Sequence, residues 1–155
     1  MSKVEPSPDL LVLAQQAAGT HDLWPELVCA VIEQESGWDR WAVRYEPAFY
    51  KRYIEPLLAR PMPAPPNETE ARMRAFSWGL MQVMGQVARE HGFGGRSLAQ
   101  LCDPAIGLDV GCRVLAAKLA AAEGNVNRAL LLWNGGANRL YPEAVLARAQ
   151  RYVAK

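Results

Sequence analysis

The chain has 155 residues, of which 50% are hydrophobic and 21% are charged, which suits one globular domain with its own core. Its formal net charge of +1 at pH 7 excludes a bulk electrostatic attraction to nucleic acid or to an anionic membrane. No apolar run is long enough to cross a membrane, and the three cysteines lack metal-ligand or redox spacing. We therefore expect a single monomeric domain over residues 1–155, with no membrane insertion, metal or cofactor.

The N-terminal segment does not have the basic-then-apolar layout of a secretory signal peptide. Ser7, Pro8 and Asp9 instead resemble the capped start of a helix, which predicts a first helix from about Asp9 to Ala18. On this pattern we expect synthesis in the cytoplasm without a signal peptide.

Residues 23–36 are predicted to form a helix with one buried face, made of Trp24, Leu27, Val28, Val31 and Ile32. Glu35 follows Val28 by seven residues, which returns it to within about 20° of that face, and Gly37 can end the helix. Burial and the negative end of the helix dipole both disfavour an ionised carboxyl group there. Such a glutamate suits general acid catalysis, although this helix alone favours a structural glutamate that snorkels or pairs with an arginine.

The middle of the chain is less regular. Residues 38–50 are rich in aromatic residues, and residues 47–59 are predicted to form a helix with Phe49, Tyr50, Tyr53, Ile54 and Leu57 on one side. Residues 60–67 contain four prolines, which excludes regular structure and predicts a surface excursion within the domain. Asn67 and Glu70 then predict a capping box for a helix that ends at Phe76.

The remaining segments are also predicted to be helical. Their ranges are 77–91, beginning near Gly79, then about 103–122, 127–133 and 141–152. No alternating strand of convincing length is present. The predicted fold class is therefore all-α, or α+β with a minimal hairpin. Cys102 and Cys112 are compatible with a disulfide between a loop and a helix, and equally with two free thiols.

Four short segments carry the residue types of a carbohydrate site, although each has an ordinary structural explanation by itself. They are Glu35-Ser36-Gly37, Gly79-Leu80-Met81-Gln82, Trp133-Asn134-Gly135-Gly136 and the segment Tyr141 to Val145. Each could be only a helix end, a helix start with core side chains, or a packed aromatic residue. Together they place aromatic rings and amides with an acid, and this combination suits sugars, which offer apolar faces and many hydroxyls.

The order of these segments resembles the catalytic domain of the soluble lytic transglycosylases, a lysozyme-like family related to goose-type lysozyme. Glu35-Ser36 matches the family's Glu-Ser motif, and residues 79–82 match its Gly-Leu-Met-Gln motif letter for letter. Trp133-Asn134-Gly135-Gly136 resembles the Tyr-Asn-x-Gly motif with tryptophan in the tyrosine position. Tyr141 and Val145 resemble the Tyr-Val-x-x-Val motif. The resemblance covers residues 20–153.

The resemblance implies a lysozyme-like helical domain with a substrate groove, which cleaves the β-1,4 bond between N-acetylmuramic acid and N-acetylglucosamine in peptidoglycan. Glu35 would be the general acid and then the base, and the product would carry a 1,6-anhydro end. Tyr141 would form a hydrogen bond with Glu35 and orient it. The residues implied to bind the glycan are Ser36, Gly79, Leu80, Met81, Gln82, Trp133 and Asn134, with Trp133 expected to alter stacking without removing activity.

Two other functions remain open in the sequence. Glu46, beside Arg44 and Tyr45, could activate water if it faced Glu35 at the separation of roughly 6.5–9.5 Å found in inverting enzymes, and a hydrolytic muramidase or chitinase-like glycosidase would result. An ordinary Arg44–Glu46 surface pair is the structural alternative. A non-catalytic glycan-binding module is the second functional alternative.

The expected setting follows from the N-terminal pattern. Enzymes that maintain the cell envelope are normally exported, whereas phage lysins wait in the cytoplasm and virion-associated enzymes also lack a signal peptide. We therefore expect a bacteriophage or prophage lysin (an endolysin) or a virion-associated enzyme that acts on the cell wall or in the periplasm.

Overall fold

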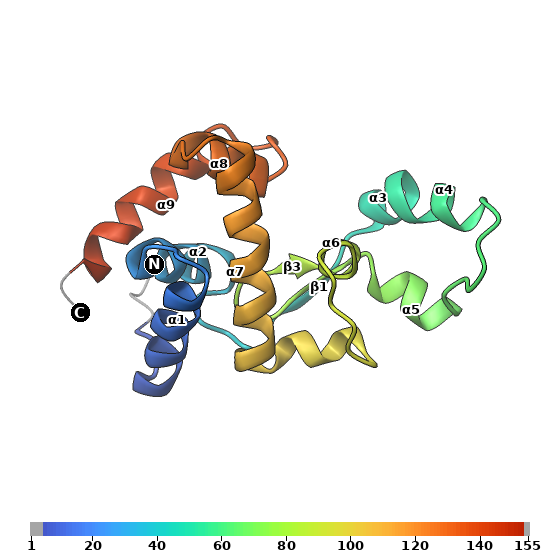
Figure 1. Cartoon of the computed structure of the whole chain (residues 1–155), viewed down its shortest axis with the longest axis horizontal. Coiled ribbons are helices and arrows are strands. Elements are labelled where there is room, and N and C mark those ends of the chain that lie inside the picture. The colour runs from blue at the N-terminus through green and yellow to red at the C-terminus, as the bar shows by residue number, and fades with distance from the viewer. Residues whose placement is uncertain (1–4, 154–155) are drawn as a thin grey trace.

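The computed structural model describes residues 5–153 and consists of a helical body with a small sheet and a lobe beside it (Figure 1). The body contains α1 (Pro8–Thr20), α2 (Pro25–Ser36), α7 (Pro104–Ala121), α8 (Val126–Trp133) and α9 (Tyr141–Ala149), with short 3-10 helices η2 (Leu98–Cys102) and η3 (Gln150–Tyr152). In Figure 1, α7 runs between α1, α2 and α9 on one side and the sheet on the other. The expectation of a mostly helical, lysozyme-like fold is confirmed.

Helix α2 supplies the centre of the core. Residues 27–32 are all buried, and Gly37 ends the helix as predicted, with φ 59°. The helix begins at Pro25, two residues after the predicted start at Leu23. The prediction that Trp24 belongs to the buried face is wrong, because Trp24 is 52% exposed. It precedes the first turn as the N-cap residue, so the helical period does not apply to its side chain.

Three short strands form an antiparallel sheet in the order β1 (Val43–Tyr45), β2 (Phe76–Trp78), β3 (Val83–Met84). Val43 is opposite Trp78, and Ser77 is opposite Met84. The helix predicted to begin near Gly79 is wrong, since Gly79–Gln82 turns between β2 and β3 and α6 covers only Gly85–Glu90. Gly79 and Gln82 have φ of 70° and 52°, in the left-handed region that a right-handed helix does not contain.

The segment between β1 and β2 folds into a lobe of short helices. These are α3 (Pro47–Phe49), the π-helical η1 (Tyr50–Ile54), α4 (Glu55–Leu58) and α5 (Glu68–Met73), and we call residues 47–75 the insertion lobe. The single helix predicted over 47–59 is thus split into three pieces, and α5 ends before Phe76, which lies in β2. Tyr50, Ile54, Ala71 and Ala75 form a small core separate from the main one. Most side chains of residues 60–67 are exposed.

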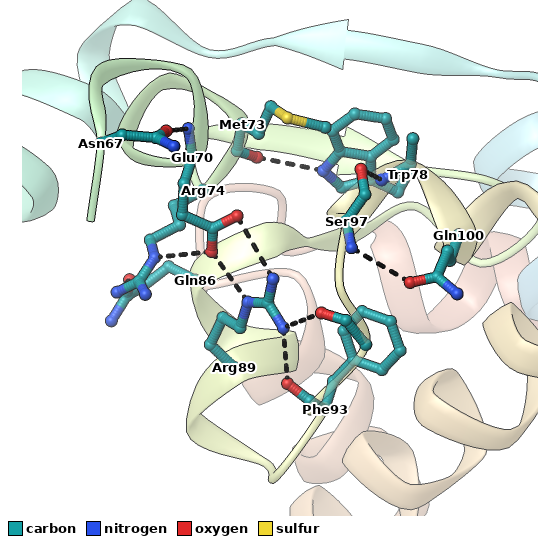
Figure 2. Close-up of polar contacts among 12 residues, drawn as sticks. Asn67, Glu70, Met73, Arg74, Trp78, Gln86, Arg89, Phe93, Ser97 and Gln100 are labelled. Carbon is teal, nitrogen blue, oxygen red and sulfur yellow. Dashed lines mark hydrogen bonds and ion pairs between the residues drawn. The ribbon is translucent and has the colours of Figure 1, made fainter.

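An ion-pair network ties the insertion lobe to α6 (Figure 2). The Glu70 carboxylate accepts two hydrogen bonds from Arg89, at 2.8 and 3.2 Å, and one from Arg74 at 3.1 Å. Arg89 also donates to the carbonyls of Phe93 and Gly95. Asn67 caps α5 as predicted, but the capping box is wrong, because the Glu70 side chain is turned to the arginines instead of the helix end.

The three cysteines are free thiols, so the disulfide alternative for Cys102 and Cys112 is wrong and the alternative of two thiols holds. Cys112 is fully buried, and burial raises its pKa to about 12. Among residues 5–153, no helix is both long and apolar enough to cross a membrane. The same residues contain no group of three or more His, Cys, Asp and Glu side chains arranged to hold a metal ion.

Candidate active site

A groove of about 970 Å³ lies between the insertion lobe and the helical body, which is at the upper end of the range for ligand sites and suits an oligomeric ligand. One wall consists of residues from Phe49 to Arg60, and the opposite wall comes from α7 and α8. The sheet and α6 complete it. Arg44 and Glu46 face the groove, as does Ser77, because alternate residues of a strand point to the same side. Glu35 lies in the lining of this groove.

Glu35 is in the last turn of α2, as the sequence predicts, and one of its oxygens is held by two side chains. The Tyr141 hydroxyl donates to Glu35 Oε1 at 2.5 Å, and the Trp133 indole Nε1–H donates to the same atom at 3.1 Å. Both donors come from distant segments, at the start of α9 and the end of α8. The structure therefore brings together three of the four sequence motifs around one carboxyl oxygen.

Burial raises the pKa of Glu35 above its ordinary value. The hydrogen bonds from Tyr141 and Trp133 and the positive charge of Arg44 act in the opposite direction, but they do not cancel the effect of burial. Burial and the neighbouring Glu35 raise the pKa of Tyr141, so its hydroxyl stays protonated as a hydrogen-bond donor. The site thus contains a carboxyl group that favours protonation and a phenol that is fixed as its donor.

The predicted hydrogen bond between Tyr141 and Glu35 is confirmed, whereas the bond from Trp133 was not foreseen. Stacking was the predicted contribution of Trp133, since the sequence shows only that an aromatic residue precedes Asn134. No local pattern in the sequence predicts which group the indole N–H contacts. The one indication of such a contact is that the family motif has tyrosine where this chain has Trp133, since both are aromatic residues with a polar group.

Two residues predicted to contact the glycan lie in the core instead. Leu80 is 2% exposed and Met81 is 1% exposed, and Met81 packs against Gly111. Neither residue is among those that line the groove, so their side chains support the turn from the core. Gly79 is also buried, and the group that approaches it closely is the carbonyl of Leu101, whose oxygen is 2.6 Å from where a Cβ atom on Gly79 would lie.

Ser36 joins the end of α2 to this turn. Its hydroxyl donates to the Leu80 carbonyl at 2.8 Å and to the Ile32 carbonyl at 3.2 Å. Ser36 is not among the residues that line the groove. These contacts explain physically why Glu-Ser and Gly-Leu-Met-Gln occur together, because the second motif fixes the helix end that carries Glu35.

Gln82 and Asn134 do line the groove. Gln82 Nε2 donates to the carbonyls of Ala42 and Gly79, both at 2.9 Å, and Gln82 Oε1 accepts from the Ser77 hydroxyl at 2.8 Å. These bonds hold β1 against the turn. Asn134 caps α8 and donates to the Asn138 carbonyl at 3.3 Å, while Asn134 Oδ1 faces no donor within the described residues and can accept from a ligand.

Glu46 forms the pair with Arg44 that the sequence allowed, at 2.6 Å between Nε and Oε1. The pair lies in the lining of the groove rather than on a remote surface. The positive charge of Arg44 also lowers the pKa of Glu35, so Arg44 interacts with both carboxyl groups.

A protonatable carboxyl group, fixed by a phenol and an indole in a groove, is an arrangement that suits enzymes that cleave bonds between sugars. The family model described as Transglycosylase SLT domain matches residues 12–150, and the chain belongs to this family. No curated protein and no solved structure matches the chain. Family membership confirms the resemblance seen in the sequence and implies a lytic transglycosylase that acts on peptidoglycan and thus on the cell wall.

Proposed function

We propose that Glu35 cleaves the β-1,4 bond between N-acetylmuramic acid and N-acetylglucosamine as the sole acid and base of the reaction. The observation that carries this proposal is the arrangement around its carboxyl group. Both donors, Tyr141 and Trp133, bond to Oε1. A protonated Glu35 therefore keeps its proton on Oε2, which is left to donate to the glycosidic oxygen.

In the first step, the Oε2 proton passes to the glycosidic oxygen as the bond from that oxygen to the anomeric carbon breaks. The carboxylate that remains is stabilised by the two bonds to Oε1. In the second step, the carboxylate removes the proton of the muramic acid C6 hydroxyl, whose oxygen then bonds to the anomeric carbon. The product has a 1,6-anhydro end, no water is consumed, and Glu35 is protonated again.

Glycan binding in this proposal uses groove residues with a free polar atom or an exposed face. Asn134 would accept from a sugar hydroxyl or N-acetyl N–H, and Trp133 would contact the glycan with its ring. Gln82 contributes to the groove surface, while its hydrogen bonds keep β1 in place. Ser36 acts through the helix end rather than by touching the glycan.

The decisive experiment compares wild type with Glu35→Gln on purified peptidoglycan. We expect the variant to lose at least about 10³-fold in activity, because general acid and base steps typically contribute 10²–10⁴-fold each. It should remain folded, since an amide oxygen can still accept from Tyr141 and the desolvated carboxylate is removed. Mass analysis of the wild-type products should show anhydro ends. Equal clearing of the suspension by both proteins would refute the role of Glu35.

Hydrolysis is the second candidate, and the presence of Glu46 in the same groove favours it. Glu46 accepts a hydrogen bond from Arg44 at 2.6 Å and would be the group that activates water in this reaction. Reducing ends instead of anhydro ends would identify this reaction. Glu46→Gln would then lose most of its activity, whereas full activity of this variant would eliminate water activation by Glu46.

One further alternative function has an outcome of its own in this experiment, and the biological setting is a separate question. A non-catalytic glycan-binding module would bind glycan strands and release no product with either protein. The origin as a phage or prophage lysin stays a prediction, which bears on the setting and not on the chemistry of the groove.

A further inference from the structure

Three cations in the groove have no role in the proposed reaction. They are Arg52 in η1, Arg60 just after α4, and Lys118 in α7. Among residues 5–153, no carboxylate forms an ion pair with any of them. Arg52 and Arg60 are exposed and Lys118 is half-buried, so their charged ends are open to a ligand in the groove.

The other charged residues of the groove have hydrogen-bond partners, although the partner of Glu90 is a neutral amide that leaves its negative charge uncompensated. Arg44 pairs with Glu46, and Glu35 is bonded by Tyr141 and Trp133. Glu90 accepts a hydrogen bond from the amide of Gln86 at 3.0 Å. The free charge of the groove is therefore mainly positive, although the whole chain is nearly neutral at +1. Because the whole chain is nearly neutral, this local positive charge would favour an anionic group bound in the groove and would not attract polyanions to the protein in general.

The cations stand on both sides of the groove. Arg52 and Arg60 belong to the insertion lobe, whereas Lys118 belongs to the helical body. The Arg52 guanidinium lies 5.2 Å from the centre of the Tyr53 ring, which in turn lies 4.8 Å from the Phe49 ring. Stacking of this kind limits the orientations of the guanidinium, and its planar fork fits a carboxylate. The aromatic pair offers an apolar surface beside it.

We propose that Arg52, Arg60 and Lys118 bind the carboxylates of stem peptides attached to the muramic acid lactyl groups of the glycan. This inference rests on the proposed function, because it takes a muramyl glycan as the ligand. A strand that lies along the groove with its scissile bond at Glu35 would carry lactyl substituents between the two walls. Acidic side groups would meet positive charge on either wall, so peptide-bearing strands would be favoured over neutral ones.

The test compares three kinds of glycan strand: strands with intact acidic stem peptides, strands stripped of peptide so that lactyl carboxylates remain, and strands whose carboxylates have been amidated. The variant Arg52→Gln/Arg60→Gln/Lys118→Gln changes exposed or half-buried side chains and keeps hydrogen-bonding amides. The matched control, Lys51→Gln/Arg96→Gln/Arg128→Gln, removes the same charge from residues outside the groove lining. The readout is the ratio of kcat/KM on peptide-bearing strands to kcat/KM on amidated strands.

We expect the groove variant to lower this ratio about tenfold, mostly through KM, since each exposed ion pair contributes little and three act together. The control should keep the wild-type ratio. Salt should lower the wild-type ratio as well, because the Debye length falls from about 10 Å at 0.1 M to about 3 Å at 1 M. An equal loss on stripped strands would assign the contact to the lactyl carboxylate, and a loss confined to intact strands would assign it to the peptide.

Binding measurements separate this inference from the reaction itself. In the Glu35→Gln background, affinity for peptide-bearing strands should fall with the groove substitutions even if no product forms. If the groove variant and the control have the same ratio and the same affinity, the cations do not read the substituents. Anhydro products would then still support Glu35 as the acid, and only the inference about Arg52, Arg60 and Lys118 would be overturned.

Discussion

The Tyr141 hydroxyl lies 2.5 Å from Glu35 Oε1, and these two residues are separated by 106 positions in the chain. The contact exists because α9 packs on α2 with Tyr141 at its first turn, 5% exposed. A phenol at this distance favours the carboxylate over the acid, since a hydrogen bond to the charged form stabilises it. The pKa of Glu35 is raised because the effect of burial exceeds the opposite effect of this hydrogen bond. Removing the bond should therefore raise the pKa further.

Tyr141→Phe should raise the pKa of Glu35 further. A hydrogen bond to a charged group contributes about 1.5–3 kcal/mol, and its loss disfavours the carboxylate relative to the acid. Because the first step needs the protonated acid, the alkaline limb of the pH profile of kcat/KM should move to higher pH. The maximal rate should fall about tenfold or more, because the carboxyl group loses its orientation. An unmoved alkaline limb would contradict the role of Tyr141.

Trp133→Phe keeps an aromatic ring but removes the second donor to Glu35 Oε1. We expect a smaller shift in the same direction, because the bond from Trp133 is longer than that from Tyr141. Both donors share one oxygen, so the double variant with Tyr141→Phe should not show the sum of the single effects in kcat. A double-mutant cycle on kcat measures this coupling. Additive effects would mean that the two side chains act on Glu35 independently.

The face of α2 could be predicted from the sequence because helical periodicity depends on residues close in the chain. Glu35 is seven residues from Val28, and a regular helix fixes their relation. The contact of Trp133 with Glu35 depends on how α8 packs at the end of α2, and no local spacing contains that information. The segment that contains Trp133 could therefore be assigned to the site from the sequence, whereas the hydrogen bond from Trp133 to Glu35 could not.

The turn at Gly79 shows why a periodic pattern can mislead. Leu80 and Met81 are buried and adjacent, and together with Met84 and Val87 they imitate one helical face. The helix is prevented by the left-handed backbone of Gly79 and Gln82, which forms because the turn packs on Leu101 and is tied to Ala42. These contacts come from segments distant in sequence, so they override the local preference.

Gly79→Ala should destabilise the fold by about 2–4 kcal/mol, because a methyl group would enter a left-handed backbone position and meet the Leu101 carbonyl. Activity should fall with stability, since the turn holds Ser36 at the end of α2. Urea unfolding measures the change. The matched control is Gly94→Ala, where no atom lies within 4 Å of an added Cβ and φ is not in that region. Equal stability of the two variants would contradict the packing argument.

Glu33, two residues before the proposed acid Glu35, has a carboxyl group whose pKa is lowered instead of raised. Burial raises its pKa, but hydrogen bonds from Tyr152 at 2.6 Å and from Arg151, with the charges of Arg151 and Arg148, outweigh burial and leave the pKa lowered. The ionised side chain, 7% exposed, thus joins α2 to α9 and η3. Its contribution to stability should be present above its ordinary pKa of 4.5 and should disappear as the pH falls through the lowered folded value.

Glu33→Gln should therefore reduce the free energy of unfolding at pH 7 by about 2–4 kcal/mol, because two arginines lose their partner at a largely buried site. The difference from wild type should begin to shrink as the pH falls below about 4.5, where the unfolded chain starts to bind a proton at Glu33, and should disappear once the pH is below the lowered pKa of the folded state. Urea unfolding at a series of pH values measures this difference. Glu123→Gln, at an exposed glutamate after α7, is the control and should follow wild type throughout. A Glu33→Gln deficit that is the same at every pH would show that packing, rather than the charge of Glu33, joins α2 to α9 and η3.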